Sequence, residues 1–342
     1  MRRSKATVAL VTCATMDGGG GRQMARIPWA QIPQAQSYEV DQQVDQWEEH
    51  NARSLIELTC GVAQDARFRA RQVNLQLDQL HLAQVTATAH RVSRDRTVIA
   101  RRPAGAIAVY VGLRGDSLFE YDGGRRVMHP GQLLVCDVDQ PFARDFGHGL
   151  HELAVKVPRA AFATHTETAT LTTPLVLEAR GPDDDPYARA LARLVGRAVA
   201  ATVPVPADEQ AVLELVAVLA TGSRRSLPLA HRAAARAFID DHLSDPSLSA
   251  TAVAAGASIS ERHLSRLFAD AGTSVPRHIL GRRLDLAHSM LTHGVPAHVR
   301  IVDVAAQCGF TSMAHFAQAF KRRFGATPGE VRFGAGAGAG PA

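Results

Sequence analysis

Two short stretches in the last third of this 342-residue sequence carry the side chains best suited to recognising a ligand. Each stretch brings arginine or lysine together with small polar or apolar side chains at helical spacing. A guanidinium can bind O6 and N7 of guanine with two hydrogen bonds, and cations also bind backbone phosphate. These residue types therefore indicate contact with double-stranded DNA. They form no catalytic constellation, so we expect no catalytic residue, no cofactor and no enzyme activity.

The first stretch follows Ser260, a residue type suited to capping a helix. Leu264, Leu267 and Phe268 recur at the spacing of one buried helix face. The candidate DNA contacts are polar residues of the same stretch: Arg262, His263, Ser265 and Arg266. The two arginines are the candidates for guanine. A phosphate contact is the alternative for each, and base readout is favoured for Arg266.

The second stretch, GFTSMAHFAQAFKRRFG from Gly309 to Gly325, repeats this arrangement. Ser312 is the expected N-cap, and Phe316 and Phe320 lie four residues apart on the inward face. The candidate DNA contacts are Ser312, Met313, Ala314, Ala317, Gln318, Lys321, Arg322 and Arg323. Side-chain methyl groups in this set suit thymine, and the amide of Gln318 suits adenine. The three cations at the end of the helix suit backbone phosphate.

Each stretch is preceded by a short helical pattern and a turn that contains glycine, which is the order of a helix-turn-helix motif. The two turns, at Gly256 and Gly309, lie 53 residues apart. Residues 274–294, SVPRHILGRRLDLAHSMLTHG, carry one apolar stripe at helical spacing and predict a helix that joins the two modules. About 17 residues at 1.5 Å each would make this helix roughly 25 Å long.

The paired modules, the joining helix and the closing pattern GF…F…F…FGATPGEVR resemble the DNA-binding domain of the AraC/XylS family of transcription regulators, over residues 231–332. The resemblance implies DNA and RNA polymerase as partners, with the modules in successive major grooves about 34 Å apart. Met313 and Ala314 stand where the family often has polar residues, and Gln318 stands in place of a frequent arginine. We therefore expect poorer hydrogen-bond readout in the second module.

Charge and composition agree with a globular protein of two domains. Residues 231–332 hold 12 lysines and arginines against 8 acidic residues, whereas the rest of the chain is nearly balanced at 26 against 25. The excess favours phosphate contact, although a solvated basic surface would look the same. Four cysteines without CxxC spacing predict neither a disulfide framework nor a zinc site. No apolar run approaches the roughly 20 residues of a membrane span, so we expect no membrane contact.

We expect the two ends of the sequence to be flexible: a leader over residues 1–36 and a disordered tail over 334–342. The first residues, MRRSKATVALVTCATM, have the basic start of a signal peptide, but Asp17 and four glycines follow. A DNA reader would find no target after export. We therefore expect a cytoplasmic protein.

From Leu77 to Pro158 the sequence changes to short strand patterns separated by turn residues. The tripeptide DGG at residues 122–124 predicts a hairpin, and a PGQLLV strand follows it. This order resembles the cupin-like domain of AraC-type regulators, in which a jelly roll holds a small molecule. The resemblance implies a small-molecule effector. The candidate ligand-binding residues are Tyr110, Arg114, Tyr121 and Arg144, although each also suits an exposed strand or loop position.

A cupin metal site is an alternative that four residues raise: His129, His148, His151 and Glu152. On one strand, residues three apart point to opposite faces, so His148 and His151 would not converge on one ion. We therefore expect turn and surface histidines, and no metal.

Two helical patterns over residues 185–221 follow the strands, and they suit core packing or, as the family resemblance implies, a homodimer interface. A linker over 223–230 would separate a domain of residues 37–222 from the DNA-binding domain, 231–333. The predicted class is α+β: a cupin-like jelly roll with flanking helices, then an all-α domain of two helix-turn-helix modules joined by a long helix. The sequence favours a transcription regulator that is controlled by a small-molecule ligand. The alternatives are a regulator that acts through protein contacts and a cupin-type metalloenzyme fused to a DNA reader.

Overall fold

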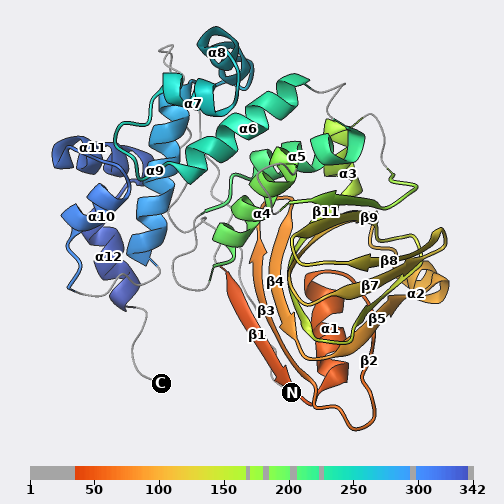
Figure 1. The fold of residues 1–342 in the computed structure, drawn as a ribbon. Coiled ribbons are helices and arrows are strands. Elements are labelled where there is room, and N and C mark those ends of the chain that lie inside the picture. Colours follow the sequence, from red (N-terminus) through yellow and green to blue (C-terminus); the bar gives the residue numbers. More distant parts are fainter. Residues whose placement is uncertain are drawn as a thin grey trace, which may run out of the picture.

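The computed structural model describes residues 35–166, 170–179, 185–200, 206–222, 227–292 and 298–337. A β-rich part comes first, and a group of helices follows it (Figure 1). Two sheets face each other in the β-rich part, and a layer of helices lies between the larger sheet and the C-terminal helices. This is the predicted α+β class, with a cupin-like first half and a helical second half.

The strands form two antiparallel sheets. The larger sheet has the order β1-β3-β4-β11-β6-β9-β12, and the smaller one has the order β2-β5-β10-β7-β8. Their bounds are β1 (Gln36–Asp41), β2 (Thr59–Gly61), β3 (Arg69–Gln76), β4 (His81–Ala87), β5 (His90–Arg94), β6 (Ala106–Arg114), β7 (Ser117–Tyr121), β8 (Gly124–Met128), β9 (Gln132–Asp137), β10 (Phe142–Phe146), β11 (Leu150–Pro158) and β12 (Leu175–Glu178). Strands therefore extend beyond the expected range of 77–158, because β1 to β3 and β12 complete the sheets.

Turn residues and strand parity explain how the sheets are built. Tyr121 pairs with Gly124 across a two-residue turn between β7 and β8, as the DGG tripeptide predicts. In β6, Ile107, Val109 and Val111 belong to the core beneath the helices, whereas Ala108 and Tyr110 belong to the core between the sheets. Successive side chains of a strand point to opposite faces, and here both faces are buried. One parity of β6 therefore lines the interior of the barrel.

Helices α1 (Val44–Ser54), α2 (Arg96–Arg101), α3 (Arg159–His165), α4 (Pro186–Ala198) and α5 (Glu209–Thr221) accompany the sheets. α1 lies inside the curve of the two sheets, and α3 to α5 lie beside the larger sheet (Figure 1). In α5 every residue from Ala211 to Leu219 is buried. The pair α4 and α5 therefore forms core packing in this chain, and α5 offers almost no free face for a dimer contact.

The C-terminal helices are α6 (Leu227–Asp241), α7 (Ala250–Gly256), α8 (Glu261–Asp270), α9 (Val275–Thr292), α10 (Ile301–Gln307), α11 (Met313–Phe324) and α12 (Pro328–Ala337). α9 has 18 residues, so it is about 27 Å long, and it runs between the two modules (Figure 1). Gly309 occupies the turn before α11 with φ 79°, and a Cβ there would lie 2.5 Å from the Leu243 carbonyl oxygen. The second turn thus requires glycine.

Three of the expected boundaries fall partly on residues that the structure does not describe. Of the leader, residue 36 already belongs to β1. Of the linker over 223–230, residues 227–230 form the first turn of α6, and α12 continues to Ala337 in the range expected for the tail. Among the described residues, no helix is long and apolar enough to span a membrane.

Candidate nucleic-acid interface and ligand cavity

Helix α8 presents the first set of candidate DNA contacts. Ser260 caps it by accepting a hydrogen bond from the His263 backbone N–H at 3.3 Å. The inward residues Leu264, Leu267 and Phe268 are buried, as their spacing predicts. Arg262, Ser265 and Arg266 are exposed on the opposite face.

His263 is placed differently from the other three candidates of α8. Its side chain is half-buried and turned toward α6, where Nε2 lies 3.2 Å from Nδ1 of His231. Its Nδ1 lies 2.9 Å from an Nη of Arg266. Both ring nitrogens therefore already have partners within the protein, which leaves this imidazole poorly placed to contact a base.

Helix α11 presents the second set. Ser312 caps it by accepting from the His315 backbone N–H at 3.3 Å, and Phe316, Ala319, Phe320 and Phe324 are buried. The exposed candidates are Ser312, Met313, Ala314, Gln318, Lys321 and Arg322, with Ala317 half-buried. His315 is also exposed, although it was not among the candidates predicted from the sequence. It stands three residues after a capping serine, as His263 does, and that shared spacing is the signal that would have found it.

Arg323 does not lie on the exposed face with its neighbours. Its Nε donates to Oδ1 of Asp285 on α9 at 2.9 Å, and the two side chains are 14% and 17% exposed. Residue 323 stands three positions after the buried Phe320, which brings it to the inward side of the helix. Burial raises the pKa of Asp285, and the positive charge of Arg323 opposes that rise. Arg323 is therefore poorly placed for the expected phosphate contact, which stays a prediction.

The first turn of α5 joins the barrel to the C-terminal helices. Glu209 Oε1 accepts from the backbone N–H groups of Gln79 and Leu80, both at 2.7 Å, in the turn between β3 and β4. The preceding residue, Asp208, caps α5 and lies 3.3 Å from Nη1 of Arg236 on α6. Two consecutive acidic residues thus hold the sheet on one side and α6 on the other.

Asp208 sits in a cluster of buried charges that extends to α9. Its Oδ2 lies 3.4 Å from Nε2 of His278, and burial lowers the pKa of His278 to about 4. Burial alone would raise the pKa of Asp208, but the charges of Arg236 and Arg282 outweigh burial and lower it. Arg282 of α9 donates to both carboxylate oxygens of Asp240 on α6, at 2.7 and 2.9 Å, and to the Pro206 carbonyl. Helices α6 and α9 are therefore bonded to Asp208 and Pro206, the residues that lead into α5.

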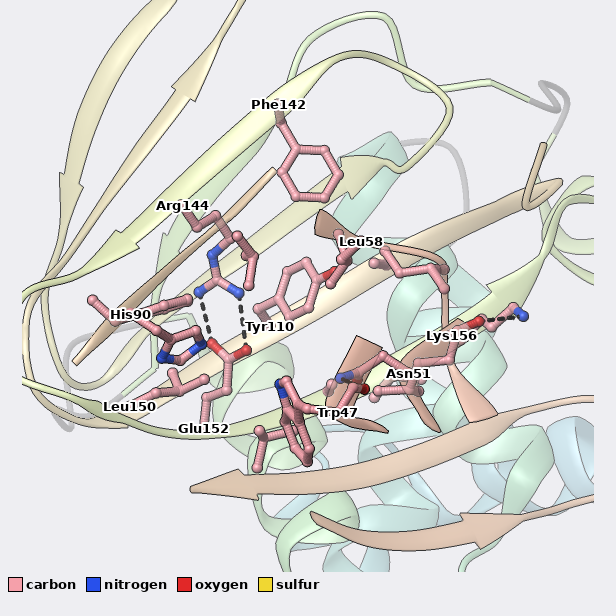
Figure 2. Close-up of a pocket in the computed structure, with 18 residues that line it drawn as sticks. Trp47, Asn51, Leu58, His90, Tyr110, Phe142, Arg144, Leu150, Glu152 and Lys156 are labelled. Atoms are coloured by element: carbon pink, nitrogen blue, oxygen red, sulfur yellow. Dashed lines mark hydrogen bonds and ion pairs between the residues drawn. The ribbon is translucent and has the colours of Figure 1, made fainter. Parts of the chain in front are cut away.

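A cavity of about 50 Å³ lies between α1, the loop after it and the two sheets (Figure 2). Eighteen residues line it: Trp47, Asn51, Leu55, Ile56, Leu58, Val85, His90, Val92, Ala108, Tyr110, Phe142, Arg144, Phe146, Leu150, Glu152, Ala154, Val155 and Lys156. Most of these side chains are apolar or aromatic, which is the usual composition of a small-molecule site.

Arg144 and Glu152 form a buried ion pair at one end of the cavity (Figure 2). Two hydrogen bonds of 2.9 and 2.6 Å join the guanidinium to the carboxylate, and each side chain is 5% exposed. The guanidinium carbon also lies 4.3 Å from the centre of the Tyr110 ring and 4.7 Å from that of Phe146. The positive charge is therefore already balanced by a carboxylate and held between two rings.

Two further polar side chains of the cavity are committed to backbone carbonyls. Nδ1 of His90 lies 2.7 Å from the Thr88 carbonyl oxygen, so this nitrogen donates, and burial lowers the pKa of His90. At the other end, Nζ of Lys156 donates to the Leu55 carbonyl oxygen at 2.6 Å, and burial lowers its pKa as well. Burial raises the pKa of Tyr110, so its hydroxyl keeps its proton.

Two of the four expected ligand-binding residues line this cavity, and two do not. Tyr110 and Arg144 face it, whereas Arg114 is exposed near the end of β6, and Tyr121 stacks on Phe119 at 5.4 Å beside another hollow. The expected ligand-binding set did not include Glu152, or the aromatic residues that other segments bring to the cavity. Strand parity could have found Glu152, because Glu152, Ala154 and Lys156 are two residues apart and share one face of β11, and all three line the cavity.

The histidines of the alternative metal site do not converge on Glu152. His151 is bonded to Gln84 at 2.7 Å, while Glu152 points into the cavity, because neighbouring residues of β11 face opposite sides. His129 lies 3.1 Å from Asp116 at the surface. In the part of the chain that the structure describes, no three His, Cys, Asp or Glu side chains are grouped so as to hold a metal ion.

Two family models match this chain, and they match its two parts in order. Residues 47–223 match the AraC-binding-like domain, and residues 253–333 match a helix-turn-helix domain. The chain belongs to the AraC family of transcription regulators. It is thus a DNA-binding regulator with a cupin-like first domain and a helix-turn-helix second domain.

Curated relatives agree with this assignment. The transcriptional activator NphR of a Rhodococcus species is 26% identical over 271 residues, which cover 74% of this chain and 77% of that protein. The transcriptional activator RhrA of Rhizobium meliloti is 32% identical over 110 residues, so the match spans about a third of each protein. Among solved structures, the AraC-like transcriptional activator CuxR aligns over 75% of this chain and 96% of its own, with 17% identity and a TM-score of 0.45.

Proposed function

We propose that α8 and α11 read DNA from two successive major grooves on one face of the duplex. The length of α9, about 27 Å, and the exposed polar faces of both helices support this arrangement. In the first module, Arg266 and Arg262 would bind guanine. In the second, Met313 and Ala314 would contact thymine methyl groups, and Gln318 would bind adenine.

Lys321 and Arg322 are the proposed phosphate contacts of α11. Both are exposed, and both stand in its last turn. Contacts of this kind add affinity on every sequence and make binding sensitive to salt. Ser265 and Ser312 are exposed, and they would form hydrogen bonds with the DNA backbone or with base edges.

We also propose that a small molecule in the barrel cavity controls DNA binding. The observation that carries this proposal is the cavity lined by Trp47, Tyr110 and Phe142. The larger sheet forms part of the wall of this cavity, and the same sheet contains β3 and β4, whose connecting turn is bound by Glu209. Asp208, the residue before Glu209, contacts Arg236 of α6 and His278 of α9. These contacts would connect the barrel to the C-terminal helices that include α8 and α11. A ligand that favours one arrangement of these contacts would shift the DNA-bound population.

The cavity favours a neutral effector over a carboxylate. Arg144 is already paired with Glu152, so an acid would have to displace that buried carboxylate or remain beside it unpaired. A cavity of about 50 Å³ is also well below the roughly 150 Å³ that admits benzene, so an aromatic effector would have to move α1. Trp47 of α1 faces the cavity and would report such a movement through its fluorescence.

The partners and setting follow from this role. We propose that the protein acts in the cytoplasm, contacts RNA polymerase, works as an activator as NphR and RhrA are named, and functions as a homodimer. Because α5 is buried in the chain, a dimer would need another surface. We propose a regulator and not an enzyme, and metal analysis of the purified protein tests the metalloenzyme alternative.

Selection of bound genomic fragments by the full chain tests the DNA proposal, and the expected result is an asymmetric site about two helical turns long. For the effector, a thermal-shift screen should pair each neutral compound with its acid, for example benzamide with benzoate. We expect neutral members to raise the melting temperature, to change Trp47 fluorescence and to alter a gel shift. A screen in which no binding compound changes DNA binding counts against effector control.

A further inference from the structure

Arg266 is held on the surface of α8 by a chain of two histidines. Its Nη2 is 2.9 Å from Nδ1 of His263, one helical turn back, and Nε2 of His263 is 3.2 Å from Nδ1 of His231 on α6. The two imidazoles meet edge to face, with ring centres 5.3 Å apart and planes at 90°. His263 and His231 are half-buried, whereas Arg266 is exposed.

The direction of each hydrogen bond follows from the arginine. A guanidinium has donors and no acceptor, so Nδ1 of His263 must accept through its lone pair. A neutral His263 then carries its proton on Nε2 and donates it to Nδ1 of His231. Arg266, His263 and His231 therefore form one chain in which each member donates to the next.

This chain uses one nitrogen of Arg266 and leaves the rest of its fork for DNA. A guanidinium has five N–H donors, and one bond to His263 does not use up the pair needed for O6 and N7 of guanine. A free arginine on a helix surface samples many rotamers, and it loses that freedom when it binds. An arginine that is already oriented loses less, so its preference for the correct base is expressed more fully.

We propose that His263 is a positioning residue that orients Arg266 for base readout, with His231 as its support on α6. The proposal rests on the proposed role of Arg266 as a base-reading side chain. It replaces the earlier expectation that His263 itself contacts DNA. His263 then governs discrimination at one base pair rather than affinity for DNA in general.

The second module supplies an internal control. His315 stands three residues after the capping Ser312, as His263 stands three residues after Ser260, and both backbone N–H groups donate to the capping hydroxyl at 3.3 Å. The ring of His315 is exposed and lies 6.2 Å from that of Phe310. Replacing His315 therefore changes an equivalent helix position without touching Arg266.

Two substitutions separate positioning from simple packing. In His263→Asn, the amide oxygen lies near the place of Nδ1 and can still accept from Arg266. In His263→Gln, the amide lies near the place of Nε2, so the bond to His231 can be kept while the acceptor for Arg266 is lost. Asparagine and histidine have similar helix propensities, which limits differences in folding.

The experiment uses the full chain and the DNA site obtained by genomic selection. The base pair read by Arg266 is located as the position where Arg266→Ala loses discrimination. For each variant the affinity for the site is divided by the affinity for the same DNA changed at that pair. A bidentate arginine is worth about 1 to 3 kcal/mol of discrimination, which is a ratio of about 5 to 150. Thermal unfolding of every variant checks that it is folded.

We expect His263→Asn to keep the ratio within about twofold of the parent, and His263→Ala and His263→Gln to reduce it to about a third or less. His231→Ala should reduce it less. His315→Ala should leave the ratio at this base pair unchanged even if it weakens binding on every sequence, because His315 lies on the other module and does not touch Arg266. The proposal is overturned if His263→Ala keeps the full ratio, if Asn and Ala behave alike, or if binding weakens equally on every sequence. If Arg266→Ala itself loses discrimination at no base pair, the readout role of Arg266 fails, and this inference fails with it.

Discussion

The two helix-turn-helix modules share one backbone plan and present different surfaces. In each, a serine caps the second helix, and aromatic or aliphatic side chains bury its inner face. The first module turns Arg262 and Arg266 outward, whereas the second presents Met313, Ala314 and Gln318. The capping serine and the spacing of the buried side chains thus define the helix. The outward positions do not contribute to the core, so their side chains can differ between the modules.

The modules also differ in which polar residue faces the protein. In the first, His263 turns toward α6 and bonds to His231. In the second, Arg323 turns toward α9 and bonds to Asp285. A charged or polar residue on a reading helix is therefore a DNA contact only if its position on the helix also faces outward.

The largest expected difference between the modules concerns their turns. Gly309 has φ 79°, and a Cβ there would meet the Leu243 carbonyl, which is backbone and cannot move aside. Gly256 is instead the last residue of α7, just before the turn, and a Cβ there would come within 2.2 Å of the half-buried Phe238 ring, which is a side chain and not backbone. We expect Gly309→Ala to lower the free energy of unfolding by about 2 kcal/mol or more, and Gly256→Ala by less. Urea unfolding measures both, and an equal or larger loss for Gly256→Ala would contradict the comparison.

The next difference concerns base readout. Arg266→Ala should cost about 1 to 3 kcal/mol of discrimination and relax one base position, because a bidentate guanine contact is lost. Gln318→Ala should relax another position by a smaller amount, since the second module is expected to rely more on methyl contacts. Binding titrations on single-base variants of the site measure both effects. Equal weakening on every sequence for Arg266→Ala would show that this arginine binds phosphate.

The smallest effect concerns two neighbouring cations of α11. Lys321→Ala should weaken binding to all sequences alike and reduce the slope of log affinity against log salt by about one. Arg323→Ala should leave that slope unchanged, because its guanidinium is bonded to Asp285. Arg323→Ala should instead lower the free energy of unfolding by about 1 to 2 kcal/mol, because the largely buried carboxylate of Asp285 loses its charged partner. A reduced salt slope for Arg323→Ala would return this residue to the DNA surface.

Local patterns predicted much of the fold because they depend on neighbours in the chain. The capping serines at 260 and 312, the DGG hairpin and the joining helix rest on spacing over a few residues, and the structure has each of them. The buried faces of α8 and α11 were predictable for the same reason, because 3.6-residue periodicity is visible in the sequence.

Contacts between distant segments were not predictable in this way. Arg144 of β10 was expected beside a ligand or at the surface, and it lines the cavity, but its pairing with Glu152 of β11 inside the barrel was not expected. Trp47 reaches the same cavity from α1, far ahead of the predicted barrel. Such contacts depend on which strands face each other, and strand order across two sheets leaves no short-range signal.

The sequence by itself determined the two reading modules, their caps, the helix that joins them and the kind of side chain each turns outward, because one helix carries all of that information. Tertiary structure alone decided that Arg323 bonds to Asp285 and His263 to His231, that α5 is buried, and that the charge of Arg144 is already balanced. The physical reason is that periodicity sets which residues share a face, whereas the partner that covers a face comes from elsewhere in the chain.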